Sequence, residues 1–257
     1  MSTQKILSIT AENISKEEVL EKIILFLSKP LGFFHIVSLN PENLVIANHD
    51  VEFRKALSES NVQLFDGIGI KLGCEILGIP AANRLTGVDC MEIILNFIKK
   101  NRLRVLFLGG KGDLAERVAD CYNQAHSTSI YRGIEGISNI SRSKPEEVEH
   151  ILSIVADYRP QIIFAAFGSP YQELWFYRHK EQLKGIICMG VGGAFDVVAG
   201  TVPRAPRLLR HAGLEWLFRL IIQPWRIKRQ LRLIEFVYLV LKQKFIPFYE
   251  AKNSPSP

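Results

Sequence analysis

Polar side chains and glycines follow several short apolar runs in this sequence, where binding or catalytic groups are commonly placed. Ser38 and Asn40 lie at the end of HIVSLN, and Asp66 directly follows NVQLF. A partly buried carboxylate such as Asp66 could serve as a general base, because burial moves its pKa toward neutrality. The residues also have plain structural interpretations, since Asp66-Gly67 is typical of a turn and Asn40-Pro41 of a capped helix start. Both interpretations stay open from the residues alone.

Two further polar residues could meet an anionic substrate. Arg84, in NRLTGVD, lies eighteen residues after Asp66 and could pair with an anionic group, or it could be an ordinary surface arginine. Gln172 lies in GSPYQE, where Ser169 to Gln172 fits a helix capping box with Pro170 as the first helical residue. An amide near a helix start could equally hydrogen-bond a phosphate or a sugar hydroxyl.

Two glycine-rich turns could let a phosphate or nucleotide approach the backbone closely, because glycine has no side chain. LGGKGD (108–113) follows an apolar run, but it lacks the Gly-Lys-Ser/Thr of a Walker loop. GVGGAFD (190–196) begins like a dinucleotide fingerprint, but Phe195 stands where the third glycine belongs. The turns therefore indicate the approach of a ligand without specifying a dinucleotide.

The C-terminal part of the chain is chemically unlike the rest. Residues 201–257 contain eleven Lys/Arg and three Asp/Glu, whereas the whole chain has a net charge of +6, so residues 1–200 are slightly acidic. Basic tails meet polyanions, which are anionic lipid, nucleic acid or a charged substrate. We predict no metal site, because the six histidines are scattered and no D-x-D or H-x-x-x-H pattern occurs.

Three tail arginines, Arg219, Arg226 and Arg229, could neutralise a diphosphate in place of a metal. They are spaced by seven and three residues, so a helix continuing past Pro224 would place all three on one broad face. Guanidinium groups suit phosphate oxygens because they donate two parallel hydrogen bonds. The alternative, that these residues are solvated or touch lipid headgroups, stays open.

The elements that must position these residues alternate between strands and helices. Apolar runs predict strands, and helical periodicity predicts helices between them. The predicted strands are 35–40, 61–65, 104–110, 161–168 and 185–193, and the predicted helices are 15–28, 87–101, 112–125, 144–158 and 170–183. Such alternation predicts an α/β fold with a mostly parallel sheet covered by helices on both faces. Ligands of such sheets bind beyond the carboxyl ends of the strands, where the polar residues lie.

Glycine and two prolines in VVAGTVPRAP break this alternation near residues 195–206. We therefore expect a core over residues 1–200, a basic helical appendage over 201–250 and a disordered end over 251–257. The N-terminus has no apolar signal core, and no stretch reaches the roughly 18 apolar residues of a membrane-spanning helix. We expect a cytoplasmic protein that lies on the membrane surface.

The appendage is predicted to hold two helices, Arg207–Gln223 and Trp225–Phe245, joined or kinked at Pro224. The second is amphipathic and basic, which is typical of a helix lying on an anionic membrane. Its narrow apolar seam consists of Ile227, Leu231, Ile234, Tyr238 and Leu241.

Several segments together resemble a known family, the WecG/TagA/CpsF glycosyltransferases. The segments are SLNPENLVIA, LFDGIGI, NRLTGVD, FLGGKGD, FGSPYQELW and GVGGAFDVVAGTVPRAPRLLRHAGLEWLFRLIIQPWRIKR, and they run from about Ile6 to Arg232. The resemblance implies a Rossmann-like core with a C-terminal helical, membrane-associating appendage, the arrangement called GT-E. It also implies an inverting, metal-independent transfer without a cofactor. The sugar, typically N-acetylmannosamine, would move from UDP to polyprenyl-pyrophosphate-linked N-acetylglucosamine in cell-envelope (teichoic acid) or extracellular polysaccharide synthesis.

The resemblance also implies roles for single residues. Asp66 looks like the catalytic base that deprotonates the acceptor hydroxyl, and Gln172 would contact donor or acceptor. The other predicted site residues are Ser38, Asn40 and Arg84 in the same pocket, Gly192, Gly193 and Asp196 in the nucleoside site, and Arg219, Arg226 and Arg229 on the pyrophosphate. Ser38 stands where threonine is expected in the family, and the hydroxyl group is retained.

Two other classes of function fit parts of the sequence. The glycine turns suggest a nicotinamide-dependent oxidoreductase, against which the missing third glycine counts. The basic tail suggests a non-enzymatic membrane- or nucleic-acid-binding adaptor, which leaves the polar residues at the strand ends unexplained. The partners we expect are a UDP-sugar donor, a polyprenyl-diphosphate acceptor and an anionic membrane surface, with no nucleic acid. The sequence leaves the donor sugar, the pathway and homo-oligomerisation open.

Overall fold

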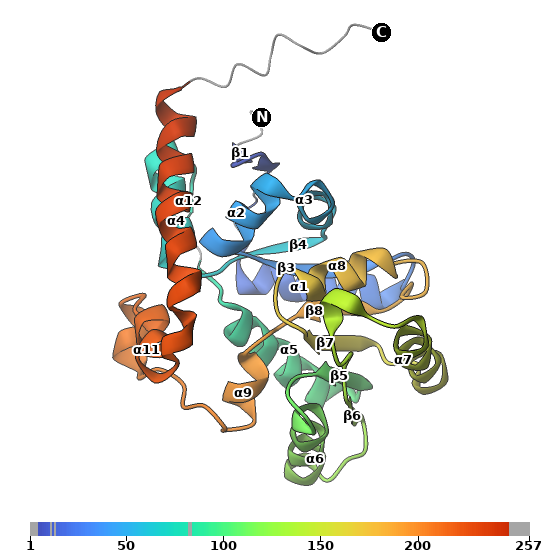
Figure 1. Cartoon of the computed structure of the whole chain (residues 1–257). Helices are drawn as coiled ribbons and strands as arrows, with labels where there is room; N and C mark the ends of the chain where they lie inside the picture. The colour runs from blue at the N-terminus through green and yellow to red at the C-terminus, as the bar shows by residue number, and fades with distance from the viewer. Residues whose placement is uncertain (1–4, 11, 13, 82–83, 247–257) are drawn as a thin grey trace, which may run out of the picture.

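A six-stranded parallel sheet forms the centre of the molecule in a computed structural model (Figure 1). Its strands are β3 (Phe34–Leu39), β4 (Val62–Phe65), β5 (Val105–Gly109), β6 (Tyr131–Ile134), β7 (Ile162–Ala166) and β8 (Ile187–Gly190), in the order β4-β3-β8-β7-β5-β6. A separate antiparallel pair consists of β1 (Lys5–Ile6) and β2 (Ile9–Thr10). The structure describes residues 5–10, 12, 14–81 and 84–246, without the side chains of residues 211 and 228–230.

Helices cover both faces of the sheet, because successive strand residues point to opposite sides. One face packs against α1 (Lys16–Ser28), α5 (Gly87–Asn101), α6 (Leu114–His126) and α9 (Ala194–Val198). The other packs against α2 (Pro41–His49), α3 (Val51–Ser58), α7 (Pro145–Tyr158) and α8 (Tyr171–Arg178), and a short 3-10 turn (Ile140–Arg142) precedes α7. In β3, Ile36 contributes to the first core layer and Val37 to the second. The predicted α/β fold is confirmed.

Sequence reasoning missed some elements of the core. β6, with the sequence YRGI, lacks an apolar run, and its Gly133 lies so close to α6 that an added Cβ would be 2.2 Å from the Ala115 carbonyl oxygen. Helix α4 (Ile68–Leu77) begins two residues after Asp66 and contains two internal glycines, which lower its intrinsic helix propensity. The short helix α3 was also not predicted.

The C-terminal region differs from the prediction in one connection. The single helix expected over 207–223 is wrong, because the chain forms α10 (Arg207–His211) and α11 (Glu215–Ile222) with a turn between them. Gly213 occupies the left-handed region at this turn, with φ of +76°, a conformation that glycine adopts without a Cβ clash. The break at Pro224 is confirmed, as a 3-10 turn (Pro224–Arg226) separates α11 from α12 (Ile227–Phe245).

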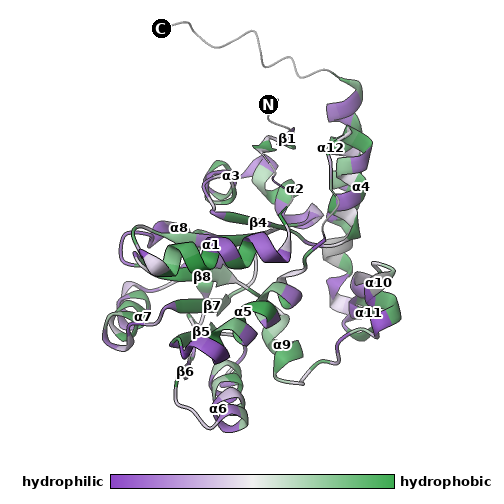
Figure 2. Ribbon diagram, turned by 180° about the vertical axis from the view of Figure 1, so that it is seen from behind, coloured by the Kyte–Doolittle hydropathy of each residue, from purple (hydrophilic) through white to green (hydrophobic). Residues whose placement is uncertain are grey.

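Helix α12 lies along the edge of the core, beside α2 and α4 (Figures 1 and 2). Its buried face contains Phe236 and Val240, which join the same apolar cluster as residues of α2, α3 and α4. The predicted seam of Ile227, Leu231, Ile234, Tyr238 and Leu241 is exposed. The helix therefore has a second apolar face that the sequence reasoning missed. Within the described residues, no helix is both long and apolar enough to cross a bilayer.

Candidate active site

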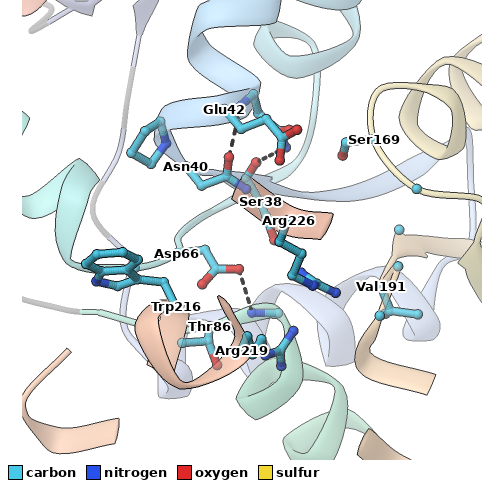
Figure 3. Close-up of a pocket in the computed structure, with 18 of the residues that line it drawn as sticks. Ser38, Asn40, Glu42, Asp66, Thr86, Ser169, Val191, Trp216, Arg219 and Arg226 are labelled. Atoms are coloured by element: carbon cyan, nitrogen blue, oxygen red, sulfur yellow. Dashed lines mark hydrogen bonds between the residues drawn. The ribbon is translucent and has the colours of Figure 1, made fainter. Parts of the chain in front are cut away.

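A cavity of about 880 Å³ lies at the carboxyl ends of β3, β4, β7 and β8, and residues of the appended helices line another side of it. Every predicted site residue whose side chain is described lines it: Ser38, Asn40, Asp66, Arg84, Gln172, Gly192, Gly193, Asp196, Arg219 and Arg226. Figure 3 labels five of them, Ser38, Asn40, Asp66, Arg219 and Arg226. The side chain of Arg229 lies outside the described part of the chain. The rule that ligands of parallel sheets bind at the strand carboxyl ends therefore located the cavity correctly.

Asp66 is held at the end of β4 by backbone and side-chain hydrogen bonds. Its N–H donates to the Leu39 carbonyl at 2.9 Å, and its Oδ2 accepts from the Gly87 N–H at 3.3 Å. Burial raises the pKa of Asp66 to about 6, while the Gly87 hydrogen bond and the Arg219 charge oppose that rise. A carboxyl group with this pKa can accept a proton near neutral pH.

Gly87 at the start of α5 lies beside both the Asp66 carboxylate and the Ser38 hydroxyl. An added Cβ at Gly87 would lie 3.3 Å from Ser38 Oγ and 3.7 Å from Asp66 Oδ2. The neighbouring Thr86 caps α5 by accepting the Asp89 N–H at 3.2 Å. The absence of a side chain at Gly87 leaves room for its backbone N–H to reach the carboxylate.

Asn40 has the structural role that its sequence context suggested and also lines the cavity. Its Oδ1 accepts the Asn43 N–H at 2.9 Å, so the N-cap interpretation is confirmed. Glu42, in the first turn of α2, places a second carboxylate at the cavity and pairs with Arg232 of α12 at 2.7 Å. Sequence reasoning missed Glu42, although it belongs to the same Asn-Pro-Glu segment.

Gln172 joins two loops of the site rather than forming a capping box. Its Oε1 accepts the N–H groups of Gly168 and Gly192, both at 3.1 Å, and its Nε2 donates to Glu173 at 2.9 Å. The capping-box prediction is wrong because the Ser169 hydroxyl donates to the Glu173 carboxylate at 2.8 Å, and α8 begins only at Tyr171. Burial raises the pKa of Glu173. Gln172 thereby fixes the loop after β7 to the glycine turn after β8.

Two arginines attach the appendage to the core. Arg84 donates from Nη2 to the Arg210 carbonyl at the end of α10, so in this structure it contacts the protein backbone. Arg204, in the segment between α9 and α10, pairs with Asp89 and with Glu92 of α5, the latter at 2.6 Å. These contacts hold the α10–α11 turn over the cavity.

The appendage brings cations into the cavity from two different elements. Arg219 of α11 pairs with Glu215 at 3.0 Å, and Arg226 of the 3-10 turn bonds Gln223. Arg226 also lies close to the glycine turn, since a Cβ added at Gly193 would be 3.1 Å from its Nη2. The two arginines do not share one helix face, because the chain breaks at Pro224 as predicted, yet both guanidinium groups line one cavity.

The glycine turn after β8 lines the cavity with Gly190, Gly192 and Gly193. A Cβ added at Gly190 would lie 2.6 Å from the Gln172 side chain, so glycine there makes room for Gln172. Together with the arginines, this surface suits a phosphate-bearing ligand that approaches the backbone closely. Among the side chains that the structure describes, no three His, Cys, Asp or Glu groups gather as metal ligands would.

Sequence reasoning missed Glu215 and Trp216, which also line the cavity. Both lie in the LEWL segment, and the signal for Glu215 was its position four residues before Arg219, where helical ion pairs form. No local pattern indicated that Trp216 faces a ligand cavity (Figure 3).

Comparison with known proteins agrees with this geometry. A model described as the glycosyl transferase WecG/TagA/CpsF family matches residues 4–248. An N-acetylglucosaminyldiphosphoundecaprenol N-acetyl-beta-D-mannosaminyltransferase of Bacillus subtilis (strain 168) is 31% identical over 209 residues, which are 81% of this chain and 79% of the relative. The protein of that name from Staphylococcus aureus (strain NCTC 8325 / PS 47) is 27% identical over 240 residues, 93% of this chain and 92% of the relative. These matches favour a hexosyltransferase over an oxidoreductase or an adaptor, and the chain belongs to the WecG/TagA/CpsF family of glycosyltransferases.

Proposed function

We propose that the protein transfers N-acetylmannosamine from its UDP conjugate to a polyprenyl-diphosphate-linked N-acetylglucosamine, with inversion and without a metal ion. Two relatives that cover most of the chain bear names for this transfer onto a diphosphoundecaprenol-linked sugar. The observation that carries the proposal is the Asp66 carboxylate, with a pKa raised to about 6, in the same cavity as Arg219 and Arg226. The reaction would serve cell-envelope, teichoic-acid-type or extracellular polysaccharide synthesis.

The proposed chemistry is a single displacement. Asp66 takes the proton of the acceptor hydroxyl as that oxygen bonds to the anomeric carbon of the sugar. The bond from this carbon to the UDP oxygen breaks, and its electron pair leaves with the diphosphate. Attack from the side opposite the leaving group inverts the anomeric carbon, and guanidinium groups neutralise the charge that develops on UDP.

Metal independence rests on the chemistry of the cavity. Arg219 and Arg226 can donate paired hydrogen bonds to phosphate oxygens, the task that a divalent cation performs in other transferases. Turnover in a chelator should therefore equal turnover without it. Loss of activity on chelation, restored by a divalent cation, would contradict this part of the proposal.

Membrane association at the cytoplasmic face is the proposed location. An apolar surface is provided by the exposed seam of α12 and by the exposed Trp225 just before this helix. The sequence of the helix also contains several basic residues. Such a helix can lie in a membrane interface, where a lipid-linked acceptor would be reached.

Replacement of the proposed base tests the function. Asp66→Asn should lower turnover about 10²–10⁴-fold, because it removes proton abstraction, while UDP binding is retained. Asp113→Asn, at an exposed carboxylate outside the cavity, should behave as wild type. Near-normal turnover of Asp66→Asn would refute the assignment. A panel of UDP-hexoses, including UDP-N-acetylmannosamine and UDP-N-acetylglucosamine, identifies the donor.

A further inference from the structure

The cavity continues away from Asp66 into an apolar groove between α4 and α12. One face of each helix forms the groove, with residues at the three- and four-residue spacing that brings side chains onto a common side. Its lining consists of Leu72, Gly73 and Ile76 from α4 and Leu233, Phe236, Val237 and Val240 from α12. All of these residues are apolar, in contrast to the polar residues around Asp66.

The floor of the groove is closely packed, and its rims are open. A Cβ added at Gly73 would lie 2.6 Å from the Phe236 ring, so the missing side chain is what lets α12 approach α4. Phe236 and Val240 are buried in this contact, whereas Leu72 is 50% exposed and Val237 is 41% exposed. The groove is therefore an open trough between α4 and α12.

The trough and the charged part of the cavity form one continuous space with a polar and an apolar end. Arg219 and Arg226 line the polar end, and α4 leads from Asp66 into the apolar end. Along α4, the lining runs from Gly69 to Ile76, which is two helical turns or roughly 10 Å. This shape matches an amphiphile that has an anionic head and an apolar chain.

We infer that the trough between α4 and α12 binds the isoprenoid segment nearest to the diphosphate of the acceptor lipid. The inference rests on the proposed function, which supplies a polyprenyl-diphosphate acceptor. A nucleotide sugar has no apolar chain to fill the trough, and the glycine turn after β8 offers it a polar surface instead. With the acceptor sugar at Asp66, the lipid chain would run along α4 into the trough, so the enzyme selects its acceptor by lipid as well as by sugar.

Two acceptors of different chain length test this inference in solution, without a membrane. Both carry N-acetylglucosaminyl diphosphate, one linked to a farnesyl chain and the other to an ethyl group. Each buried methylene group strengthens binding several-fold, so wild type should bind the farnesyl acceptor at least about 100-fold more tightly. The dissociation constants are measured by calorimetry, and turnover with UDP-N-acetylmannosamine is measured separately.

Variants on the rims of the trough, one in α4 and one in α12, are compared with a variant on the exposed face of α12. Leu72→Asn and Val237→Asn should each lower the farnesyl-to-ethyl preference about tenfold, because they place an amide on the rim. Ile234→Asn, three residues away on the same helix, 70% exposed and outside the cavity, should keep the wild-type preference. Circular dichroism checks that each variant is folded.

The binding and turnover readings distinguish failure of the inference from failure of the proposed function. A preference that is absent in wild type, or unchanged in both rim variants, overturns the trough as the lipid site. A preference that depends on Leu72 and Val237 supports it, even if N-acetylmannosamine is not transferred. In that case the proposed donor is wrong and the lipid site stands.

Discussion

The core and the C-terminal appendage use their apolar residues in different ways. In the core, alternate strand residues are buried under helices on both faces of the sheet, and few large apolar side chains are exposed. In the appendage, most large apolar side chains are exposed, including Trp216, Ile221 and Trp225. Among the described side chains of α12, Phe236 and Val240 are the buried ones and form a narrow face. The core thus buries most of its large apolar side chains, whereas the appendage packs on the core through one face and exposes its other apolar side chains.

The two regions also bring different chemistry to one cavity. The core supplies the Asp66 carboxylate and the glycine turn at the strand ends, and the appendage supplies Arg219 and Arg226. Because neither region holds both the base and the cations, the cavity is complete only while the appendage is docked. We therefore expect activity to depend on the docking of the appendage. Variants in the appendage and variants in the core both test this expectation.

Within the appendage, the largest effect is expected from removing its cations singly. Arg219→Gln and Arg226→Gln should each lower kcat about 10²–10³-fold, since each removes a charge that stabilises the departing diphosphate. Arg219→Gln should also raise the pKa of Asp66 further, because the Arg219 charge lowers it, and the pH–rate profile should shift to higher pH.

The control for these variants is Arg207→Gln, at an exposed arginine of the appendage that does not line the cavity. It should retain wild-type kinetics. Equal, small losses in all three variants would mean that the appendage contributes only general positive charge.

A smaller effect, on the free energy of unfolding, is expected from replacing Asp66 on the core side of the cavity. Asp66 has a pKa of about 6 instead of 3.8, so the folded state binds its proton more tightly than the unfolded state. Asp66 therefore does not reduce the free energy of unfolding below about pH 4. The free energy of unfolding falls as the pH rises from about 4 to about 6, because the carboxyl group ionises more readily in the unfolded chain. Asp66→Asn should be more stable than wild type by about 1–3 kcal/mol at about pH 8, with no difference near pH 4.

Urea unfolding at the two pH values measures this difference, with Asp113→Asn as the exposed control. An Asp66→Asn protein that is less stable than wild type at the higher pH would show that the carboxylate is held for structure rather than for chemistry.

A still smaller loss of stability is expected from breaking the ion pairs that connect the appendage to the core. Arg204 ties the segment before α10 to α5 through Asp89 and Glu92, and its side chain is largely buried while both carboxylates are partly exposed. Solvent screens such a pair, so Arg204→Ala should cost about 1–2 kcal/mol. Faster proteolysis between residues 199 and 206 and a higher KM for the acceptor would report loosened docking. Arg117→Ala, which breaks an exposed helical pair, is the control.

Much of the core and its site could be predicted from sequence because both follow from short-range rules. Apolar runs located five of the six strands of the sheet, and the strand-end rule placed Ser38, Asn40 and Asp66 in one site. β6 was missed because its sequence carries polar residues and a glycine that packs on α6. The strand is recognisable only from its neighbours in the sheet.

The appendage and the fine structure of the site depend on tertiary contacts, and there the prediction was weaker. The exposed seam of α12 could be read from its periodicity, but its buried face depends on Gly73 of α4. The orientation of Gln172 depends on Glu173 and on two glycine N–H groups from different loops. A capping box was the best local interpretation of Ser169 and Gln172. In the structure the Ser169 hydroxyl instead donates to the buried Glu173 carboxylate, and the local sequence pattern does not reveal this contact.

The smallest effect on stability is expected from the exposed face of α12, and it separates this face from the buried one. Ile234→Ser combined with Tyr238→Ser should change the free energy of unfolding by less than about 0.5 kcal/mol, because both side chains are exposed. Binding to anionic vesicles, measured by sedimentation, should nevertheless weaken about tenfold, since these side chains would enter the lipid interface. Phe236→Ala, on the buried face, should instead destabilise the protein by about 3–5 kcal/mol. If the double variant binds vesicles as wild type does, the exposed seam faces a protein surface rather than lipid, and the appendage reaches its acceptor by another route.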